Sequence, residues 1–126
     1  MTGARRVVFG LGSNVGDRGA HLAAASAALA ATPGLALVAR SRVFETPPAG
    51  GPPQGDYLNS AVLFETALAP PEVMRRALEV EHGLGRVRPD PVRWGPRTID
   101  VDILWIEGVI ADTPDLAIPH PRLRER

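Results

Sequence analysis

The sequence contains no cysteine and no lysine, so its fourteen basic residues are all arginine. Without cysteine, the chain has neither a disulfide framework nor a thiolate metal site, which is compatible with a reducing cytoplasm. Without lysine, it has no phosphate-binding lysine of the Walker type. Any grip on phosphate must therefore come from arginine or from backbone N–H groups. We favour nucleotide-composition bias over function as the cause of the missing lysine.

Net charge, aromatic residues and long apolar runs are also scarce. Fourteen acidic residues balance the fourteen basic ones, so no overall field favours nucleic acid or an anionic membrane. Aromatic residues make up 5% of the chain, few for a sheet that binds RNA. No apolar run approaches the roughly 18 residues of a membrane span, and the N-terminus has the pattern of a strand rather than of a signal peptide. A chain of 126 residues is expected to form one cytoplasmic domain.

Hydrophobic patterns predict strands and helices in a regular order. Strands are expected at 5–11, 35–45 and 57–66 and around Asp100, with helices at 18–32 and 70–84 and a short extra strand at 109–110 after a turn. Asp17 is a suitable N-cap for the first helix, and Pro70 suits the first turn of the second. The order βαββαβ predicts an α+β fold of the ferredoxin-like type, an antiparallel sheet with two helices. That fold hosts enzymes, RNA-binding modules and small-molecule sensors, so function must be argued from particular residues.

Two acidic residues, Asp100 and Asp102, lie in an otherwise apolar stretch that directly follows an arginine-rich loop. Because side chains alternate along a strand, both acids are expected on one face, with Ile99, Val101 and Ile103 on the other. A single acid could serve as a gatekeeper against aggregation at a strand edge. Two acids on one face fit that explanation less well. They predict a site for Mg²⁺, whose preferred ligands are oxygen atoms.

Four arginines lie in or beside the glycine- and proline-containing loop at 85–96; they are Arg86, Arg88, Arg93 and Arg97. Guanidinium groups repel one another without a counter-charge, and each matches phosphate oxygens with a planar fork of donors. A nucleotide triphosphate is therefore a natural partner, although a solvated loop accounts for one or two of these arginines. Trp94 either stacks on a planar ring or fills a gap in the core, and the residues alone do not decide between them.

Tyr57 and Asn59 are expected on one face of a strand that follows the segment 46–56, which holds four prolines and three glycines. An aromatic ring can stack on a heterocycle, and an amide can satisfy both a donor and an acceptor on its edge. This pair is a weak indication of a heterocycle site, because both residue types are common in strands.

The stretch Gly10-Leu-Gly-Ser-Asn-Val-Gly16 lies between a predicted strand and a predicted helix. Its glycine spacing does not match a dinucleotide- or phosphate-binding loop, and we interpret it as a tight connection. His120 lies in a rigid proline-flanked segment, where a structural role and a ligand-binding role are equally well supported.

Three segments together resemble one family, the 6-hydroxymethyl-7,8-dihydropterin pyrophosphokinases of folate biosynthesis. They are Gly12-Ser-Asn14, Thr46-Pro-Pro48 with Tyr57-Leu-Asn59, and Gly85-Arg-Val-Arg88 followed by Arg93-Trp-Gly-Pro-Arg-Thr-Ile-Asp-Val-Asp102. Pro119-His120 matches as well. The resemblance runs the length of the chain, and the last string is highly specific. It implies that residues 1–126 form a single pyrophosphokinase domain.

The resemblance implies transfer of the β,γ-pyrophosphoryl group of ATP to the hydroxymethyl oxygen of the pterin, with release of AMP. Asp100 and Asp102 would hold two Mg²⁺ ions, and Arg86 and Arg97 would clamp phosphates in the transition state. ATP and the pterin are the implied partners of a monomer that binds neither nucleic acid nor membrane. Implied ATP contacts are Glu81, Arg88, Trp94, Arg97, Ile103, His120 and Arg126. Implied pterin contacts are Thr46, Pro47, Pro48, Tyr57, Asn59 and Trp94.

Members of this family continue beyond the part that matches residues 120–126, with an aromatic residue that stacks on the second face of the pterin. We therefore expect this chain to lack the family's C-terminal segment, so that Tyr57 forms one wall of the pterin pocket and the opposite wall is not evident. Two alternatives stay open. One is a truncated or degenerate homologue that binds ATP and Mg²⁺ without turnover, and the other is a non-catalytic ferredoxin-like module that binds a small molecule.

Overall fold

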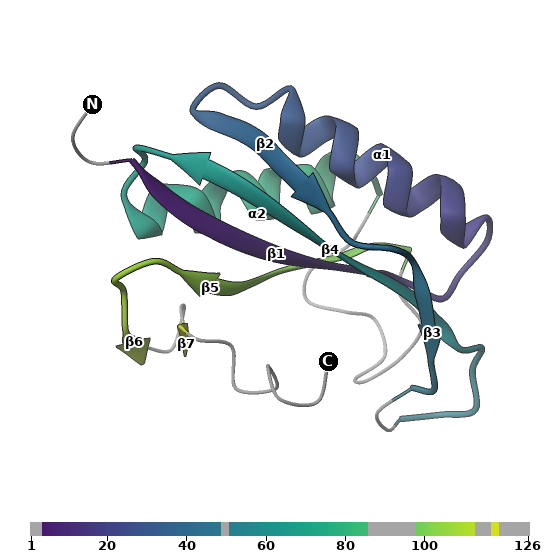
Figure 1. Ribbon diagram of the computed structural model, residues 1–126. Helices are drawn as coiled ribbons and strands as arrows, with labels where there is room; N and C mark the ends of the chain where they lie inside the picture. The colour runs from purple at the N-terminus through teal and green to yellow at the C-terminus, as the bar shows by residue number, and fades with distance from the viewer. Residues whose placement is uncertain (1–3, 49–50, 86–97, 113–116, 119–126) are drawn as a thin grey trace.

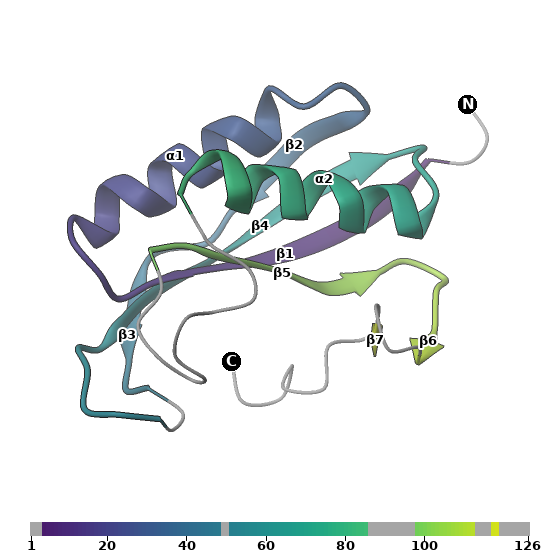
Figure 2. The same cartoon turned by 180° about the vertical axis from the view of Figure 1, so that it is seen from behind.

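The computed structural model describes residues 4–48, 51–85, 98–112 and 117–118. Within these ranges, two helices lie on one side of an antiparallel sheet, as Figures 1 and 2 show from opposite directions. Neither helix is long and apolar enough to cross a membrane. The elements in chain order are β1 (Arg5–Ser13), α1 (Arg18–Ala30), β2 (Leu35–Arg40), β3 (Phe44–Thr46), β4 (Tyr57–Thr66), α2 (Pro70–Gly83), β5 (Asp100–Ile106), β6 (Ala111–Asp112) and β7 (Ala117–Ile118).

The main sheet has the strand order β2-β4-β1-β5, and β3 pairs with the other end of β4. If β2 and β3 are taken as two halves of one strand, this is the order of a ferredoxin-like sheet, and the predicted α+β fold is confirmed. β1 lies in the middle and pairs with β4 on one side and β5 on the other. β1 therefore separates β5, which carries Asp100 and Asp102, from β4, which carries Tyr57 and Asn59.

Three of the predicted strands differ from the structure. The expected strand at 35–45 is divided, because the Ser41 hydroxyl accepts a hydrogen bond from Ala61 N at 2.8 Å where a ladder bond would otherwise form. β1 continues to Ser13 rather than turning after Leu11, because β4 pairs with it as far as Ser13 and β5 as far as Gly12. The expected strand at 109–110 is wrong: these residues follow a turn at Gly108, and the short strand β6 begins at Ala111.

The helix starts agree with the sequence-based expectations. Asp17 Oδ1 accepts a hydrogen bond from Ala20 N at 3.1 Å, which makes Asp17 the N-cap of α1. Pro70 and Pro71 occupy the first turn of α2, where the missing N–H of proline removes no helical bond. Thr32 closes α1 at its other end, because its hydroxyl donates to Ala28 O at 2.8 Å. Both helices are thus terminated by local chemistry and oriented by the apolar face that they bury.

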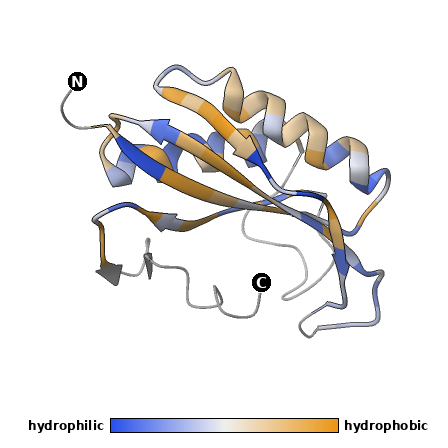
Figure 3. Cartoon of the chain, in the orientation of Figure 1, coloured by the Kyte–Doolittle hydropathy of each residue, from blue (hydrophilic) through white to orange (hydrophobic). Residues whose placement is uncertain are grey.

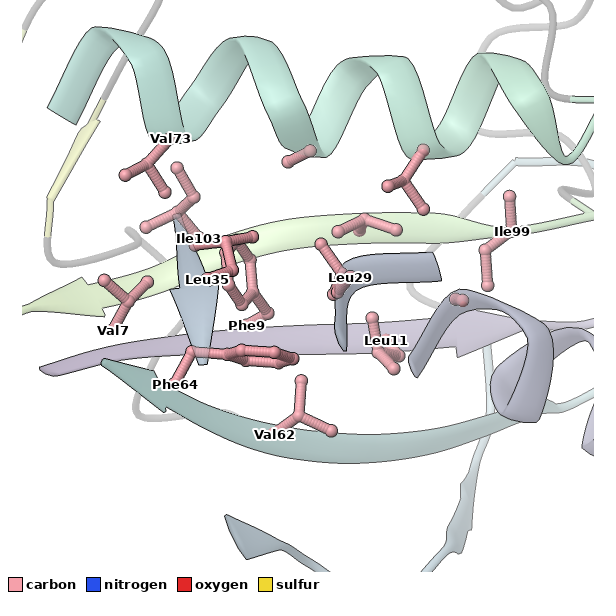
Figure 4. Close-up of a cluster of buried hydrophobic side chains, with 14 of the residues drawn as sticks. Val7, Phe9, Leu11, Leu29, Leu35, Val62, Phe64, Val73, Ile99 and Ile103 are labelled. Carbon is pink, nitrogen blue, oxygen red and sulfur yellow. The ribbon is translucent and has the colours of Figure 1, made fainter. Parts of the chain in front are cut away.

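A hydrophobic core fills the space between the helices and the sheet (Figure 4). Phe9 and Phe64 lie at its centre, with ring centroids 5.6 Å apart and planes at 82°, an edge-to-face contact. Val73, Ala77 and Val80 of α2 are buried in this core, and Leu84, at the end of the helix, is partly buried against it. Ile99, directly before β5, also contributes to the core, as do the strand residues Val7, Phe9, Leu11, Leu35, Val62, Phe64, Val101, Ile103 and Ile106. Alternate residues of β1, β4 and β5 therefore lie on the opposite, helix-free face.

The outer face of α2 carries a chain of ion pairs. α2 contains many hydrophilic residues, whereas the middle of β1 is hydrophobic (Figure 3). Glu72 lies in the first turn and pairs with Arg75 and Arg76. The hydrogen bond from Arg75, aided by the positive charges of Arg75 and Arg76, lowers the pKa of Glu72 below its ordinary value of 4.5. A carboxylate at a helix N-terminus is also favoured by the helix dipole.

Glu72→Gln is expected to lower the thermal stability slightly at pH 7 and not at all at low pH. Because the folded pKa of Glu72 is depressed, its contribution is present in full above the ordinary pKa of 4.5 and is lost as the pH falls through the lower folded value. The measurement is the Tm of both proteins from pH 7 down to pH 2. A difference in Tm that grows as the pH falls below 4.5 would contradict this assignment.

Candidate active site

The candidate site lies on the helix-free face of the sheet, where three strands meet. Gly12 of β1 is directly opposite Asn59 of β4 and, on its other side, directly opposite Asp100 of β5. Two residues earlier in β1, Gly10 lies between Ala61 of β4 and Asp102 of β5. Neighbouring strands are about 4.8 Å apart, so the backbones at Asn59 and Asp100 are separated by roughly 10 Å. The acids and the Tyr57–Asn59 pair therefore flank a strand that carries no side chain at this point.

The acidic half of the site is formed by β5. Ile99, Val101 and Ile103 are buried in the hydrophobic core, which leaves Asp100 and Asp102 on the opposite face. Asp100 is itself buried and Asp102 is half-buried. This alternation follows directly from the sequence, because five consecutive residues switch between apolar and acidic. Because a strand rises about 3.3 Å per residue, Asp100 and Asp102 are separated by roughly 6–7 Å along the strand.

Glu81 of α2 is completely buried and holds the backbone between the two acids. Its Oε2 accepts a hydrogen bond from Val101 N at 2.6 Å. β5 is the last strand in the main sheet path, so its outward backbone donors have no neighbouring strand in that path. Glu81 thereby fixes the position of Val101, and with it the two flanking acids, relative to the helix layer.

The second half of the site is formed by the ends of β3 and β4. Thr46 is directly opposite Tyr57, and Asn59 Nδ2 donates a hydrogen bond to Thr46 Oγ1 at 2.7 Å. The Asn59 amide also leans towards the middle strand: a Cβ added to Gly12 would lie 3.4 Å from Asn59 Oδ1 and 3.4 Å from Tyr57 Cδ1. An aromatic ring, an amide and a hydroxyl thus gather beside a glycine, a combination suited to the face and polar edge of a flat heterocycle.

The glycines of β1 are residues of the candidate site that the sequence analysis missed. They were interpreted as part of a tight connection, whereas the structure places Gly10 and Gly12 inside a central strand. Glycine in a strand interior weakens it and often marks a place where a ligand or another backbone approaches closely. That signal was present in the sequence, but its meaning depended on which strands would be neighbours.

The structure does not describe every predicted site residue. The arginines and Trp94 of the loop at 85–97, together with His120 and Arg126, lie outside the described ranges. Of the described candidates, Thr46, Pro48, Tyr57 and Asn59 are half-buried, and Pro47 is exposed. Ile103 has its side chain in the core, so a contact with ATP at this position would come from the backbone.

The described acids fit magnesium better than a metal held by protein alone. Among residues 4–48, 51–85, 98–112 and 117–118, no group of three or more His, Cys, Asp or Glu side chains is arranged to hold a metal ion. Two carboxylates on one strand face are instead the usual protein share of a Mg²⁺ site, where water and substrate phosphates supply the other ligands. The donor set therefore fits a metal that arrives with a polyphosphate.

Comparison with known proteins gives one consistent result. A family model described as 7,8-dihydro-6-hydroxymethylpterin-pyrophosphokinase matches residues 8–126. The chain is similar to the 2-amino-4-hydroxy-6-hydroxymethyldihydropteridine pyrophosphokinase of Methylorubrum extorquens, with 48% identity over 96% of this chain and 75% of that protein. The enzyme of the same name from Bacillus subtilis is 42% identical over 92% of this chain and 68% of its own length. The corresponding protein of Synechocystis is 38% identical, and 60% of its length is covered.

Proposed function

The chain belongs to the 7,8-dihydro-6-hydroxymethylpterin-pyrophosphokinase family, and on that premise we propose that it is the pyrophosphokinase of folate biosynthesis. It transfers the pyrophosphoryl group of ATP to 6-hydroxymethyl-7,8-dihydropterin, which gives the pterin diphosphate and AMP. The observation that carries the proposal is the register of β1. Gly12 places the acidic half of the site directly beside the Tyr57–Asn59 half, so one sheet face can receive two substrates.

In this proposal Asp100 and Asp102 hold Mg²⁺, and two ions are expected. When bound, the ions would neutralise the charge of the triphosphate and bring its oxygens close to the acceptor. The contribution of the protein is to present two carboxylates on a strand that is fixed on both sides. β1 pairs with one edge of β5, and Glu81 accepts the Val101 N–H on α2's side.

The pterin is proposed to lie against Tyr57, with its polar edge on Asn59 and on the backbone around Thr46, Pro47 and Pro48. The Asn59–Thr46 hydrogen bond holds the amide at a fixed orientation before the substrate arrives. Such preorganisation lowers the entropic cost of positioning a substrate for transfer. The hydroxymethyl group of the bound pterin would then point towards the acids, because these lie on the other side of Gly12.

The resemblance to the family assigns the remaining ATP contacts. Arg86 and Arg97 would clamp phosphates, Arg88 and Trp94 would belong to the loop over the substrates, and His120 and Arg126 would lie near the triphosphate. Arginine is well suited to this task because its planar fork donates two hydrogen bonds to one phosphate. Phosphoryl-type transfer depends mainly on positioning and charge neutralisation, so the absence of an obvious strong base among the described site residues is compatible with it. We propose that the enzyme acts as a cytoplasmic monomer.

The proposal is tested by measuring AMP formation from ATP and Mg²⁺ with and without 6-hydroxymethyl-7,8-dihydropterin. AMP is expected to form only when the pterin is present, in equal amount to the pterin diphosphate. AMP release that does not depend on the pterin would contradict the proposed acceptor. Binding of ATP and pterin without any AMP would instead identify a homologue that does not turn over.

Gly12→Ala tests whether the bare strand between the two halves is needed. The new methyl group would lie 3.4 Å from Asn59 Oδ1 and Tyr57 Cδ1, an ordinary contact distance, so the protein is expected to fold normally. The methyl group would occupy the surface that the pterin needs, and we expect kcat/KM for the pterin to fall by about tenfold, equivalent to about 1.4 kcal/mol.

Gly83→Ala is the matched control for this experiment. A Cβ at Gly83, at the end of α2, meets nothing within 4 Å, so its steady-state parameters should equal those of the wild type. If Gly12→Ala also left kcat/KM unchanged, the pterin would not lie against this strand.

A further inference from the structure

The connection between β1 and α1 is bonded to the segment that leads into the proposed pterin site. Asn14 follows β1, and its Nδ2 donates to Gln54 Oε1 at 2.8 Å and to Gly55 O at 3.0 Å. Gln54 and Gly55 belong to residues 51–56, the segment that ends directly before Tyr57. One amide nitrogen thus holds two consecutive residues of a segment rich in proline and glycine.

Burial makes this contact different from a surface hydrogen bond. Asn14 is only 9% exposed, and a Cβ added to Gly55 would lie 3.6 Å from the backbone oxygen of Asn14. The segment therefore packs against the backbone of Asn14 as well as bonding to its side chain. Both bonds are part-buried, so water replaces them less easily than it would replace a bond between exposed groups.

Arg18, the first residue of α1, supports the same segment from the surface. Its Nη1 donates to Asp56 O at 2.9 Å and to Glu45 Oε2 at 2.8 Å. Glu45 directly precedes Thr46, and Asp56 directly precedes Tyr57. Arg18 thereby joins the two chain positions from which the proposed pterin contacts begin. Both Arg18 and Glu45 are partly exposed, at 32% and 54%, so this ion pair should contribute less than the Asn14 bonds.

We propose that Asn14 is a positioning residue for the pterin, a role that rests on the proposed function. It acts through Gln54 and Gly55, which fix the start of β4 and thereby the positions of Tyr57 and Asn59. Asn59 then transmits the position to Thr46 through their hydrogen bond. The acids on β5 do not depend on this path, because they are held by β1 and by Glu81. Loss of the Asn14 bonds should therefore affect the pterin and leave the ATP half unchanged.

Asn14→Ala is expected to raise the KM for the pterin by at least about tenfold, because displacement of binding groups by about 1 Å can cost up to two orders of magnitude. The KM for ATP should stay within about twofold of the wild type, because substitutions distant from a site and without shared partners act independently of it. Direct titration with pterin, followed by its fluorescence, should show the same loss of affinity. Arg18→Gln should shift the KM for the pterin in the same direction but less.

Thr32→Val is the matched control, because it removes a side-chain hydrogen bond of 2.8 Å at the other end of α1. It should lower Tm without changing either KM. If Asn14→Ala does not fold, Gln54→Ala replaces it, since that change removes one of the same bonds from the half-exposed partner. The combined Asn14→Ala, Gln54→Ala variant should lose scarcely more pterin affinity than Asn14→Ala alone.

The proposal is overturned if the wild type is active and Asn14→Ala leaves the KM for the pterin unchanged. It is also overturned if the KM values for pterin and ATP rise together, since that would indicate a general loss of structure. A wild-type chain that forms no AMP would instead contradict the proposed function, so the two failures are distinguishable.

Discussion

Asp100→Asn and Asp102→Asn should each lower kcat/KM by on the order of 10³-fold, about 4 kcal/mol of transition-state stabilisation. Asparagine keeps the size of the side chain but removes the negative charge with which the carboxylate attracts Mg²⁺. Loss of groups that only orient a metal ligand already costs 10–100-fold, so loss of a ligand itself should cost more. The measurement is AMP formation under saturating and limiting ATP, across a range of Mg²⁺ concentrations.

Excess Mg²⁺ should restore part of the activity in each single variant, because the remaining carboxylate still offers an oxygen to the ion. Glu65→Gln provides a control that also removes one acidic charge. Glu65 is exposed on β4 and lies opposite Arg6, several residues along the sheet from the site. Its activity and Mg²⁺ dependence should match those of the wild type. Activity within about threefold of wild type in both aspartate variants would rule out their proposed role as metal ligands.

The position of the acids could be predicted from sequence because it depends only on local geometry. Ile99, Val101 and Ile103 must be buried, and alternation then directs Asp100 and Asp102 to the other face whatever the neighbouring strand is. The predicted strand at 57–66 agrees with β4 for a similar reason. Its apolar residues Val62 and Phe64 alternate, and its neighbours bury them on one side.

Contacts that join distant parts of the chain could not be predicted in this way. Gly12 lies opposite both Asn59 and Asp100 only because β1 is the middle strand, which a strand pattern does not specify. Asn14 reaches Gln54 across 40 positions of sequence. Glu81 presented a similar difficulty, since an acid in a helix is usually solvated, and here it is buried against a strand 20 residues away. Family resemblance supplied the residues of the candidate site, whereas sheet order explains why Asn59 and Asp100 flank the same glycine.

Glu81→Ala should lower the free energy of unfolding by about 2–4 kcal/mol, the range for a buried residue whose loss leaves a partner without its hydrogen bond and a space behind. Val101 N would lose the acceptor at 2.6 Å, and α2 would lose a direct bond to β5. The measurement is urea unfolding followed by circular dichroism, with the midpoint and the m-value fitted for each variant.

Glu81→Gln separates the hydrogen bond from the charge. Glutamine retains the volume and an amide oxygen that can accept from Val101 N, so this variant should recover most of the stability lost in Glu81→Ala. If Glu81 acts mainly by holding β5, Glu81→Gln should also retain kcat and the Mg²⁺ dependence of the wild type. If its negative charge is needed at the ATP site, Glu81→Gln should be stable but slow. Equal stability of the alanine variant and the wild type would show that the bond to Val101 contributes nothing to the fold.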